Sequence, residues 1–230
     1  NFGGQKKKRT AFAQSDTGKQ IMTAMIDAVR RKEASGMVER FSHHSFLTLR
    51  LCGNICCGCV IRDEYSQETV ELPGDAVIVA TGGMHGLFGN TTGSLSNTGE
   101  VTAELFRLGV PLANSEMIQY HPTTVKCGGK RMLISEAARG EGGRLFAMKD
   151  GKQWYFMEEK YPELGNLMPR DITAREIWKV SHESEVFLDM TEISEEIISN
   201  KLSGLADDCM TYLHKDIRKE PVSVLPGIHY

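Results

Sequence analysis

The 230-residue sequence lacks the features that mark several common functional classes. No apolar run reaches the ~18–20 residues that a membrane-spanning helix needs. The formal net charge of −3 contrasts with the strongly basic surface of a nucleic-acid-binding domain, so we expect no nucleic-acid partner. The sequence contains no serine-nucleophile motif, P-loop or zinc-protease signature. With 40% hydrophobic and 25% charged residues, its composition is that of a globular chain with one large or two small domains.

The glycine fingerprint of a dinucleotide-binding turn, G-x-G-x-x-G after a strand, is also missing. The glycine-rich segment 82–86, Gly-Gly-Met-His-Gly, does not match it. No cleavable signal pattern opens the chain either. Glycine spacing by itself therefore assigns no dinucleotide site.

Cysteine is present but sits in an unusual pattern, because four of the six cysteines fall between Cys52 and Cys59. Their spacing matches neither a zinc site nor a ferredoxin cluster. The adjacent Cys56 and Cys57 would face opposite sides of a strand, which is poor for joint ligation. We therefore expect no metal and predict a hairpin, with strands 46–51 and 56–61 and a turn near Gly53-Asn54. Without disulfide-like spacing, the cysteines fit a reducing compartment.

The first half of the chain carries one strong helix signal. Thr17 can cap a helix that runs to about Ser35, where Gly36 is a suitable stop. The apolar stripe of this helix, which we predict to pack in a core, consists of Ile21, Met22, Met25, Ile26 and Val29.

A short apolar run, 75–80, predicts a strand that is buried on both faces of a sheet. It leads into Thr81-Gly82-Gly83, and glycines at the carboxyl end of a strand let a ligand approach the backbone closely. Asn97 or Thr98 then caps a predicted helix to about Leu108, whose free N–H groups could face a cofactor. A tight turn and an ordinary capped surface helix would use the same residues.

From about Met117 the pattern becomes a mixture of short elements. We predict a helix that starts at Pro169, a strand over 186–190 and a helix over 192–213. The last helix carries apolar residues at helical spacing, namely Ile198, Leu202, Leu205 and Cys209.

Four motifs in this half carry basic and acidic side chains that suit a small dicarboxylic acid. They are Tyr120-His121-Pro122-Thr123-Thr124, the segment 134–143 with Ser135, Glu136 and Arg139, Pro169-Arg170-Asp171, and His229-Tyr230. Arginine and histidine can hold carboxylates by charge-assisted hydrogen bonds, and a glutamate beside arginines can pass a proton. The alternatives are a surface ion pair between Glu136 and Arg139, a structural Arg170 paired with Asp171 or Glu163, and structural histidines.

Read in order, these motifs resemble the flavoprotein subunit of succinate dehydrogenase and fumarate reductase, and most of all the bacterial menaquinone type. The same resemblance covers Phe2-Gly3-Gly4, Ala80-Thr81-Gly82-Gly83, Asn97-Thr98-Gly99, the 154–162 segment and Gly165-Asn166-Leu167-Met168-Pro169-Arg170-Asp171. It extends over essentially all 230 residues. Such subunits are more than twice as long, so we expect this chain to be part of one.

The resemblance implies an α/β and α+β fold, in which a partial Rossmann-like FAD-binding domain (1–116) receives an α+β capping domain (117–230) with hinge segments at its ends. It implies FAD as the cofactor, contacted by Ala80, Thr81, Gly82, Gly83 and Asn97. It also implies catalytic roles for Arg170, Glu136 and Arg139, and substrate binding by His121, Ser135, His229 and Phe2. The family's pyrophosphate-binding glycines and flavin-linking histidine have no counterpart in this sequence.

The activity implied is the interconversion of succinate and fumarate, with hydride transfer at flavin N5 and an arginine–glutamate proton relay. An L-aspartate oxidase of the same superfamily is the alternative, and the 230 residues alone could be an inactive capping and scaffold module. The expected partners are an iron–sulfur subunit and a membrane cytochrome subunit. They would hold the flavoprotein peripherally on the cytoplasmic side of the membrane.

Overall fold

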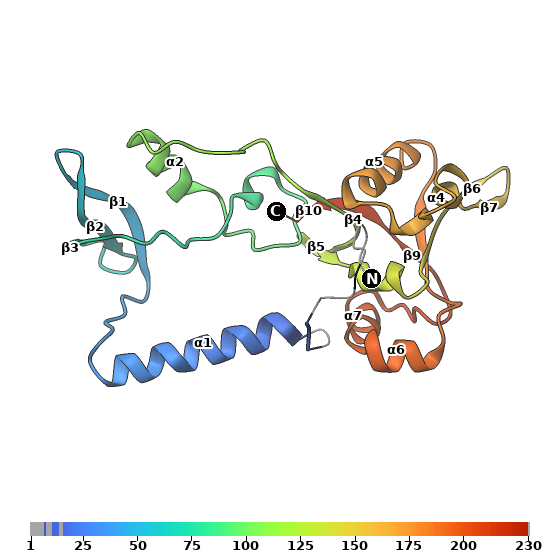
Figure 1. Cartoon of the computed structure of the whole chain (residues 1–230), viewed down its shortest axis with the longest axis horizontal. Coiled ribbons are helices and arrows are strands. Elements are labelled where there is room, and N and C mark those ends of the chain that lie inside the picture. Colours follow the sequence, from blue (N-terminus) through green and yellow to red (C-terminus); the bar gives the residue numbers. More distant parts are fainter. Residues whose placement is uncertain (1–6, 8–10, 14–15, 230) are drawn as a thin grey trace.

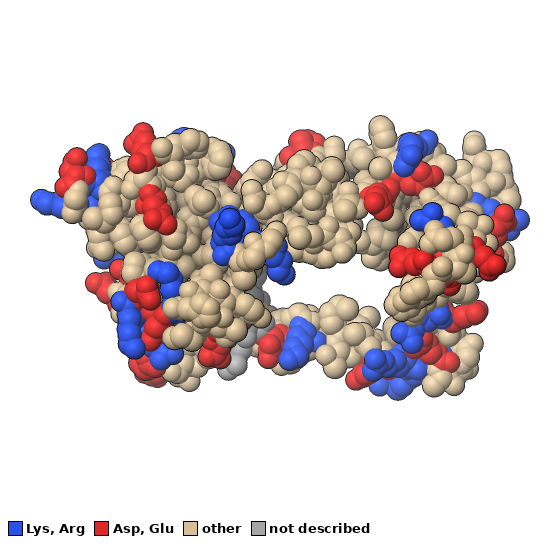
Figure 2. Space-filling model, turned by 180° about the vertical axis from the view of Figure 1, so that it is seen from behind, with Lys and Arg blue, Asp and Glu red and all other residues tan. Residues whose placement is uncertain are grey.

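The structure is a computed structural model that describes residues 7, 11–13 and 16–229. The molecule is elongated, with a three-stranded sheet at one end and most of the residues after 120 packed at the other (Figure 1). Helix α1 (Thr17–Ala34) runs below the long connections between these two ends. In the space-filling view an open window separates α1 from the segments above it (Figure 2).

Helix α1 has the predicted length, but its apolar face is exposed. Asp16 is the N-cap residue and Thr17 the first helical one, so Thr17 does not cap the helix as predicted. The side chains of the apolar stripe are 43–59% exposed, and they are Ile21, Met22, Met25, Ile26 and Val29. The prediction that this stripe packs in a core is therefore wrong, since no described element covers it.

The predicted hairpin is confirmed and extended by a third strand. Strands β1 (His44–Cys52), β2 (Ile55–Asp63) and β3 (Thr69–Pro73) form an antiparallel sheet in the order β1-β2-β3. The β1–β2 turn contains Gly53 at φ +64°, a left-handed conformation that glycine adopts without strain.

A disulfide joins Cys52 to Cys57 across this turn, with a Cα–Cα distance of 6.2 Å. The expectation that the cysteines form no disulfide is therefore wrong. Its physical reason is a register shift: Leu51 pairs with Cys56 and Arg50 with Gly58, so Cys57 lies in a bulge. In the described part of the chain, no group of three or more metal-ligating side chains could hold an ion.

The predicted strand over 75–80 is absent, because no described strand pairs with it. Ile78 is 91% exposed and Val79 42% exposed. The chain continues into the 3-10 helix η2 (His85–Phe88) and helix α2 (Glu100–Arg107). The N-cap of α2 is Gly99, in the left-handed conformation, rather than Asn97 or Thr98.

Two antiparallel sheets build the second end of the molecule. The first has the order β10-β4-β5 and consists of β10 (Leu225–Ile228), β4 (Tyr120–Cys127) and β5 (Lys130–Leu133). The second has the order β7-β6-β8-β9 and consists of β7 (Lys152–Trp154), β6 (Arg144–Lys149), β8 (Val186–Asp189) and β9 (Val222–Ser223). Strand β8 falls where a strand was predicted.

The helices of this end are short, and they pack on the two sheets. They are α3 (Glu136–Gly140), α4 (Phe156–Lys160), the 3-10 helix η3 (Gly165–Leu167), α5 (Arg170–Val180), α6 (Glu195–Lys201) and α7 (Ser203–Leu213). Helix α5 begins directly after Pro169, close to the prediction. The predicted helix over 192–213 is instead two helices, because Leu202 leaves the helical conformation at φ −121° while its side chain stays buried.

The hydrophobic core lies between residues 125 and 224. Its fully buried members include Leu145 of β6, Leu188 of β8 and Ile177 of α5, together with Ile134 and Ile217 in connecting segments. This core fixes the ends of β4, α3 and α5 relative to one another. None of the helices among the described residues is long and apolar enough to span a membrane.

Candidate active site

His121 lies at the start of β4, the central strand of its sheet. The following Pro122 favours an extended backbone here, and the pairing of His121 with Gly227 of β10 buries the imidazole to 1% exposure. Its Nδ1 lies 3.3 Å from the backbone N–H of Thr123. The ring also stands edge-on to His229, with 5.4 Å between the ring centroids. The two predicted histidines are thus neighbours, although they lie far apart in the sequence.

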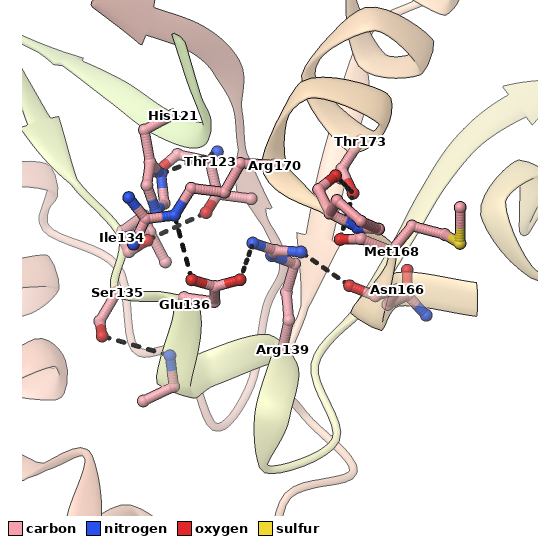
Figure 3. A network of polar contacts seen from close by, with 12 residues as sticks. His121, Thr123, Ile134, Ser135, Glu136, Arg139, Asn166, Met168, Arg170 and Thr173 are labelled. Carbon is pink, nitrogen blue, oxygen red and sulfur yellow. Dashed lines mark hydrogen bonds and ion pairs between the residues drawn. The ribbon is translucent and has the colours of Figure 1, made fainter. Parts of the chain in front are cut away.

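Helix α3 presents Glu136 and Arg139 from one turn. Ser135 is its N-cap, and the Ser135 hydroxyl accepts a hydrogen bond from the Ala137 N–H at 3.2 Å. This hydroxyl therefore points away from the Glu136 carboxylate (Figure 3). The helix ends after Gly140 because Gly142 has φ +117° and Gly143 packs directly on the Ala138 carbonyl, where a Cβ would lie 2.7 Å from the oxygen.

A single buried carboxylate links the two arginines (Figure 3). Glu136 Oε1 lies 3.4 Å from Arg139 Nη2, and Oε2 lies 3.1 Å from Arg170 Nε. The Arg139 side chain is fully buried, whereas the Arg170 side chain is 30% exposed. Arg170 also donates to Gln119 Oε1 at 2.8 Å. The alternative pairing of Arg170 with Asp171 or Glu163 is wrong, since Asp171 lies next to Arg175 instead.

His229 connects this cluster to the first half of the chain. Its Nδ1 lies 2.8 Å from the Thr92 hydroxyl, and its backbone N–H donates to the Gln119 carbonyl. Gly93, one residue beyond Thr92, packs closely against the His85 ring, since a Cβ on Gly93 would lie 2.1 Å from His85 Nε2. His85 in turn lies 3.3 Å from Asn97 Nδ2. A continuous chain of contacts therefore runs from the histidine pair to the glycine-rich segment.

Burial and positive charge keep the histidines neutral. Burial, followed by the nearby guanidinium groups of Arg170 and Arg139, lowers the pKa of His121 to about 3. The pKa of His229 is also lowered, first by burial and then by Arg170 and His85. Burial lowers the pKa of Arg139, and Glu136 partly opposes that shift. Two arginines against one carboxylate leave a net positive site with neutral imidazoles beside it, which suits an anion.

The segment predicted to contact a flavin exposes its backbone. Gly82 has φ +81°, and a Cβ there would lie 3.1 Å from Asn97 Nδ2, so only glycine allows this close approach. Ala80, Thr81, Gly82 and Gly83 are exposed. Bare backbone N–H groups beside a side-chain amide fit a cofactor that accepts and donates hydrogen bonds, such as a flavin ring.

The structure brings five predicted site residues into one cluster: His121, Glu136, Arg139, Arg170 and His229. Ser135 adjoins it but uses its hydroxyl as a helix cap, and Phe2 lies outside the described residues. Sequence reasoning missed Gln119 and Thr92, which contact Arg170 and His229. Gln119 directly precedes the Tyr120-His121 motif, and this was the only signal for it. Nothing in the sequence pattern pointed to Thr92.

Comparison with known proteins gives a consistent picture. The sequence model of a family described as "FAD binding domain" matches residues 1–230. The chain is 40% identical to a "Succinate dehydrogenase flavoprotein subunit" of Bacillus subtilis, covering 100% of this chain and 41% of that protein. It is 33% identical to a "Fumarate reductase flavoprotein subunit" of Mycobacterium tuberculosis, covering 100% of this chain and 41% of that protein.

A solved structure of an E. coli quinol fumarate reductase variant superimposes with a TM-score of 0.87 at 28% identity, over 100% of this chain and 41% of that one. This similarity confirms the expected mixed α/β and α+β fold class. The chain spans about two fifths of the length of these relatives.

Proposed function

Because this chain belongs to the FAD binding domain family, and is an FAD-dependent oxidoreductase of the succinate dehydrogenase and fumarate reductase flavoprotein type, we propose that its whole protein interconverts succinate and fumarate. FAD is its cofactor. The observation that carries the proposal is the buried Glu136 carboxylate between Arg139 and Arg170, beside the His121–His229 pair.

The histidines and Arg170 form the binding side of the site. Neutral His121 and His229 each have one ring N–H that can donate to a substrate carboxylate. The partly exposed Arg170 faces the same side and can pair with an anion bidentately. A four-carbon dicarboxylate offers two such anionic ends. It would bind with the bond between its methylene carbons beside Arg170.

Arg170, Glu136 and Arg139 contact one another in that order and can exchange a proton with the substrate. Arginine is a poor acid, so Arg170 can release a proton to a substrate carbon only if another proton arrives as the first leaves. Glu136 touches Arg170 on one oxygen and Arg139 on the other, and can pass that proton along. When bound, FAD supplies the hydride acceptor or donor at N5. We place it against Ala80, Thr81, Gly82, Gly83 and Asn97.

The domain boundaries and the partner subunits are proposed from the same family relationship. We propose that residues 1–116 belong to the FAD-binding domain and residues 117–230 to the capping domain, with His121 and His229 at its hinge ends. The names of the relatives describe subunits, so we also propose an iron–sulfur subunit and a membrane cytochrome subunit as partners. They would hold the protein peripherally on the cytoplasmic side of the membrane.

The proposal is tested with the purified full-length protein that contains this chain. Dye-linked oxidation of succinate and reduction of fumarate are measured beside oxidation of L-aspartate, with flavin content determined for each preparation. We expect turnover of succinate or fumarate and none of L-aspartate. Preferential turnover of L-aspartate would assign the oxidase instead. Bound flavin with no turnover of any of the three would overturn the proposed reaction.

A further inference from the structure

Arg139 is held by very few contacts for a fully buried cation. Its Nη2 has only the ion pair with Glu136 at 3.4 Å, and its Nε has no hydrogen-bond partner among the described residues. Its Nη1 donates to the backbone carbonyl of Asn166 at 2.7 Å. Because Glu136 is shared with Arg170, the Asn166 carbonyl is, among the described residues, the one hydrogen-bond partner that holds Arg139 independently of the carboxylate.

Asn166 itself is anchored through both ends of its side-chain amide. Its Oδ1 accepts from the Leu145 backbone N–H at 3.0 Å, which ties it to β6. Its Nδ2 donates to Glu158 Oε1 at 3.0 Å. Glu158 is held in turn by a bidentate pair with Arg144, at 2.8 and 2.7 Å. One side chain therefore connects the loop before α5 to a strand and to α4.

The same loop positions the second arginine, since Arg170 lies four residues beyond Asn166. Asn166 lies in the single turn η3, which begins at Gly165 with φ +47° and has no side-chain cap of its own, and only Met168 and Pro169 separate this turn from α5. The Thr173 hydroxyl holds the Met168 and Pro169 carbonyls, and the Asn166 amide ties the turn itself to β6 and α4. An open cavity of about 310 Å³ adjoins it, and its lining includes Arg139, Gly143 and Glu158.

We propose that Asn166 is a positioning residue for the proton relay, whose side-chain amide braces the 165–170 segment and so sets the spacing of Arg139 and Arg170 about Glu136. The inference deepens the proposed function and depends on it. Asn166 touches no reacting atom. Its effect on turnover passes entirely through the placement of the two guanidinium groups.

The test uses the full-length flavoprotein with Asn166→Ala and a matched control, Glu163→Gln. Glu163 lines the same cavity but has no hydrogen bond or ion pair in the described part of the chain. We expect kcat for succinate to fall about 10–100-fold in Asn166→Ala, because misplaced catalytic groups lose rate steeply. The flavin content should stay within a factor of two or so. The affinity for malonate, a non-reacting dicarboxylate, should fall much less than kcat, because Arg170 is one of several groups that hold the anion. The control should match the unsubstituted protein.

Two further variants distinguish the positioning role from a general folding defect. Combining Asn166→Asp with Glu158→Gln exchanges the donor and acceptor of their hydrogen bond, and should recover most of the lost turnover, whereas Asn166→Asp alone should not. If Asn166→Ala does not accumulate as folded protein, the comparison of these two variants decides the question.

Normal kcat in Asn166→Ala, or equal loss in the single and exchanged variants, would overturn the positioning role alone. A parallel loss of malonate affinity would also overturn it, since it would indicate a role in binding. Absence of succinate turnover in the unsubstituted protein would instead overturn the proposed function, so the two failures are distinguishable.

Discussion

Glu136 shares its two oxygens between two arginines that differ in burial. Arg139 is fully enclosed, whereas Arg170 keeps 30% of its side chain exposed and has Gln119 as a second partner. An enclosed cation cannot leave its carboxylate without a large desolvation cost, but a partly exposed one can exchange partners. Arg170 is therefore the group that can turn toward a ligand, and Arg139 is the fixed end of the relay.

Substitution of Arg170 by lysine should separate chemistry from cofactor binding. In the full-length protein, Arg170→Lys should lower turnover by about 10²–10⁴-fold, because lysine has no planar fork to bridge Glu136, Gln119 and a substrate. Flavin absorbance should be unchanged. Arg175→Lys, one turn along α5 and exposed, serves as the control. Near-normal turnover in Arg170→Lys would remove this residue from the proton path.

The buried His121 should make the free energy of unfolding depend on pH. Its pKa is about 3 in the folded protein and near 6.5 when unfolded, so the unfolded chain binds more protons between these values. Stability contributed by the neutral ring is present above pH 6.5 and is lost as pH falls. Between pH 7.5 and 5 the loss should be about 2 kcal/mol.

Denaturant unfolding of the protein over this pH range checks the prediction. His121→Gln should flatten the dependence by that amount, and the unsubstituted protein is the reference. An unchanged slope in His121→Gln would mean that the imidazole is not held neutral by burial. The charged groups that face this ring are Arg170 and Arg139, and the other titratable group is the neutral imidazole of His229.

Among the elements, β4 and its neighbours explain how distant motifs meet. Strand β4 pairs with β10 on one side and β5 on the other, which brings His229, just beyond β10, beside His121. Helix α3 follows β5 directly and delivers Glu136 to the same edge. The short elements leave each site residue at or next to an element end, where rigid backbone meets accessible space.

The β1–β2 hairpin should carry one reducible disulfide. Alkylation of the denatured, unreduced 230-residue polypeptide should label four cysteines, and alkylation after reduction should label all six. Because the closed loop is short, losing the Cys52–Cys57 bond should cost at most about 2 kcal/mol of stability. Cys56→Ser should preserve the bond. Six labelled cysteines without reductant, in protein purified in air, would contradict the assignment.

At the scale of the whole molecule, apolar surface is buried at one end and left exposed in segments that lie between the two ends. The end built from residues after 120 has a continuous core, with Ile134, Leu145 and Leu188 fully inaccessible. By contrast, α1 exposes its apolar stripe, and Ile78 is 91% exposed. Exposed apolar patches of this kind mark surfaces that pack against something else.

This difference predicts weak cofactor binding by the 230-residue polypeptide alone. Thr81, Gly82 and Gly83 follow an unpaired, exposed segment, so ordering them around FAD would cost conformational entropy that a paired strand would already have lost. Titration of the purified polypeptide with FAD, followed by flavin fluorescence, should give no stoichiometric quenching at micromolar concentrations. The full-length protein is the positive control. Stoichiometric quenching by the polypeptide would show that the segment is already organised.

Features that depend on local chemistry could be predicted from the order of the residues alone. The β1–β2 hairpin, the span of α1, the start of α5 after Pro169 and the apolar spacing around Ile198 and Cys209 all follow from turn residues and periodicity. The motif order identified the family, and with it the residues that cluster around Glu136. These signals are short-ranged, so one chain read in order contains them.

Features that depend on contacts between residues distant in the chain could be seen only in the folded molecule. Whether 75–80 forms a strand depends on a neighbouring strand to pair with, and whether the α1 stripe is buried depends on a surface to cover it. The break at Leu202 and the Cys52–Cys57 bond follow from packing and from a register shift. The contacts of Gln119, Thr92 and Asn166 depend on side chains that the fold brings together from distant parts of the chain. No periodicity along the sequence predicts these contacts.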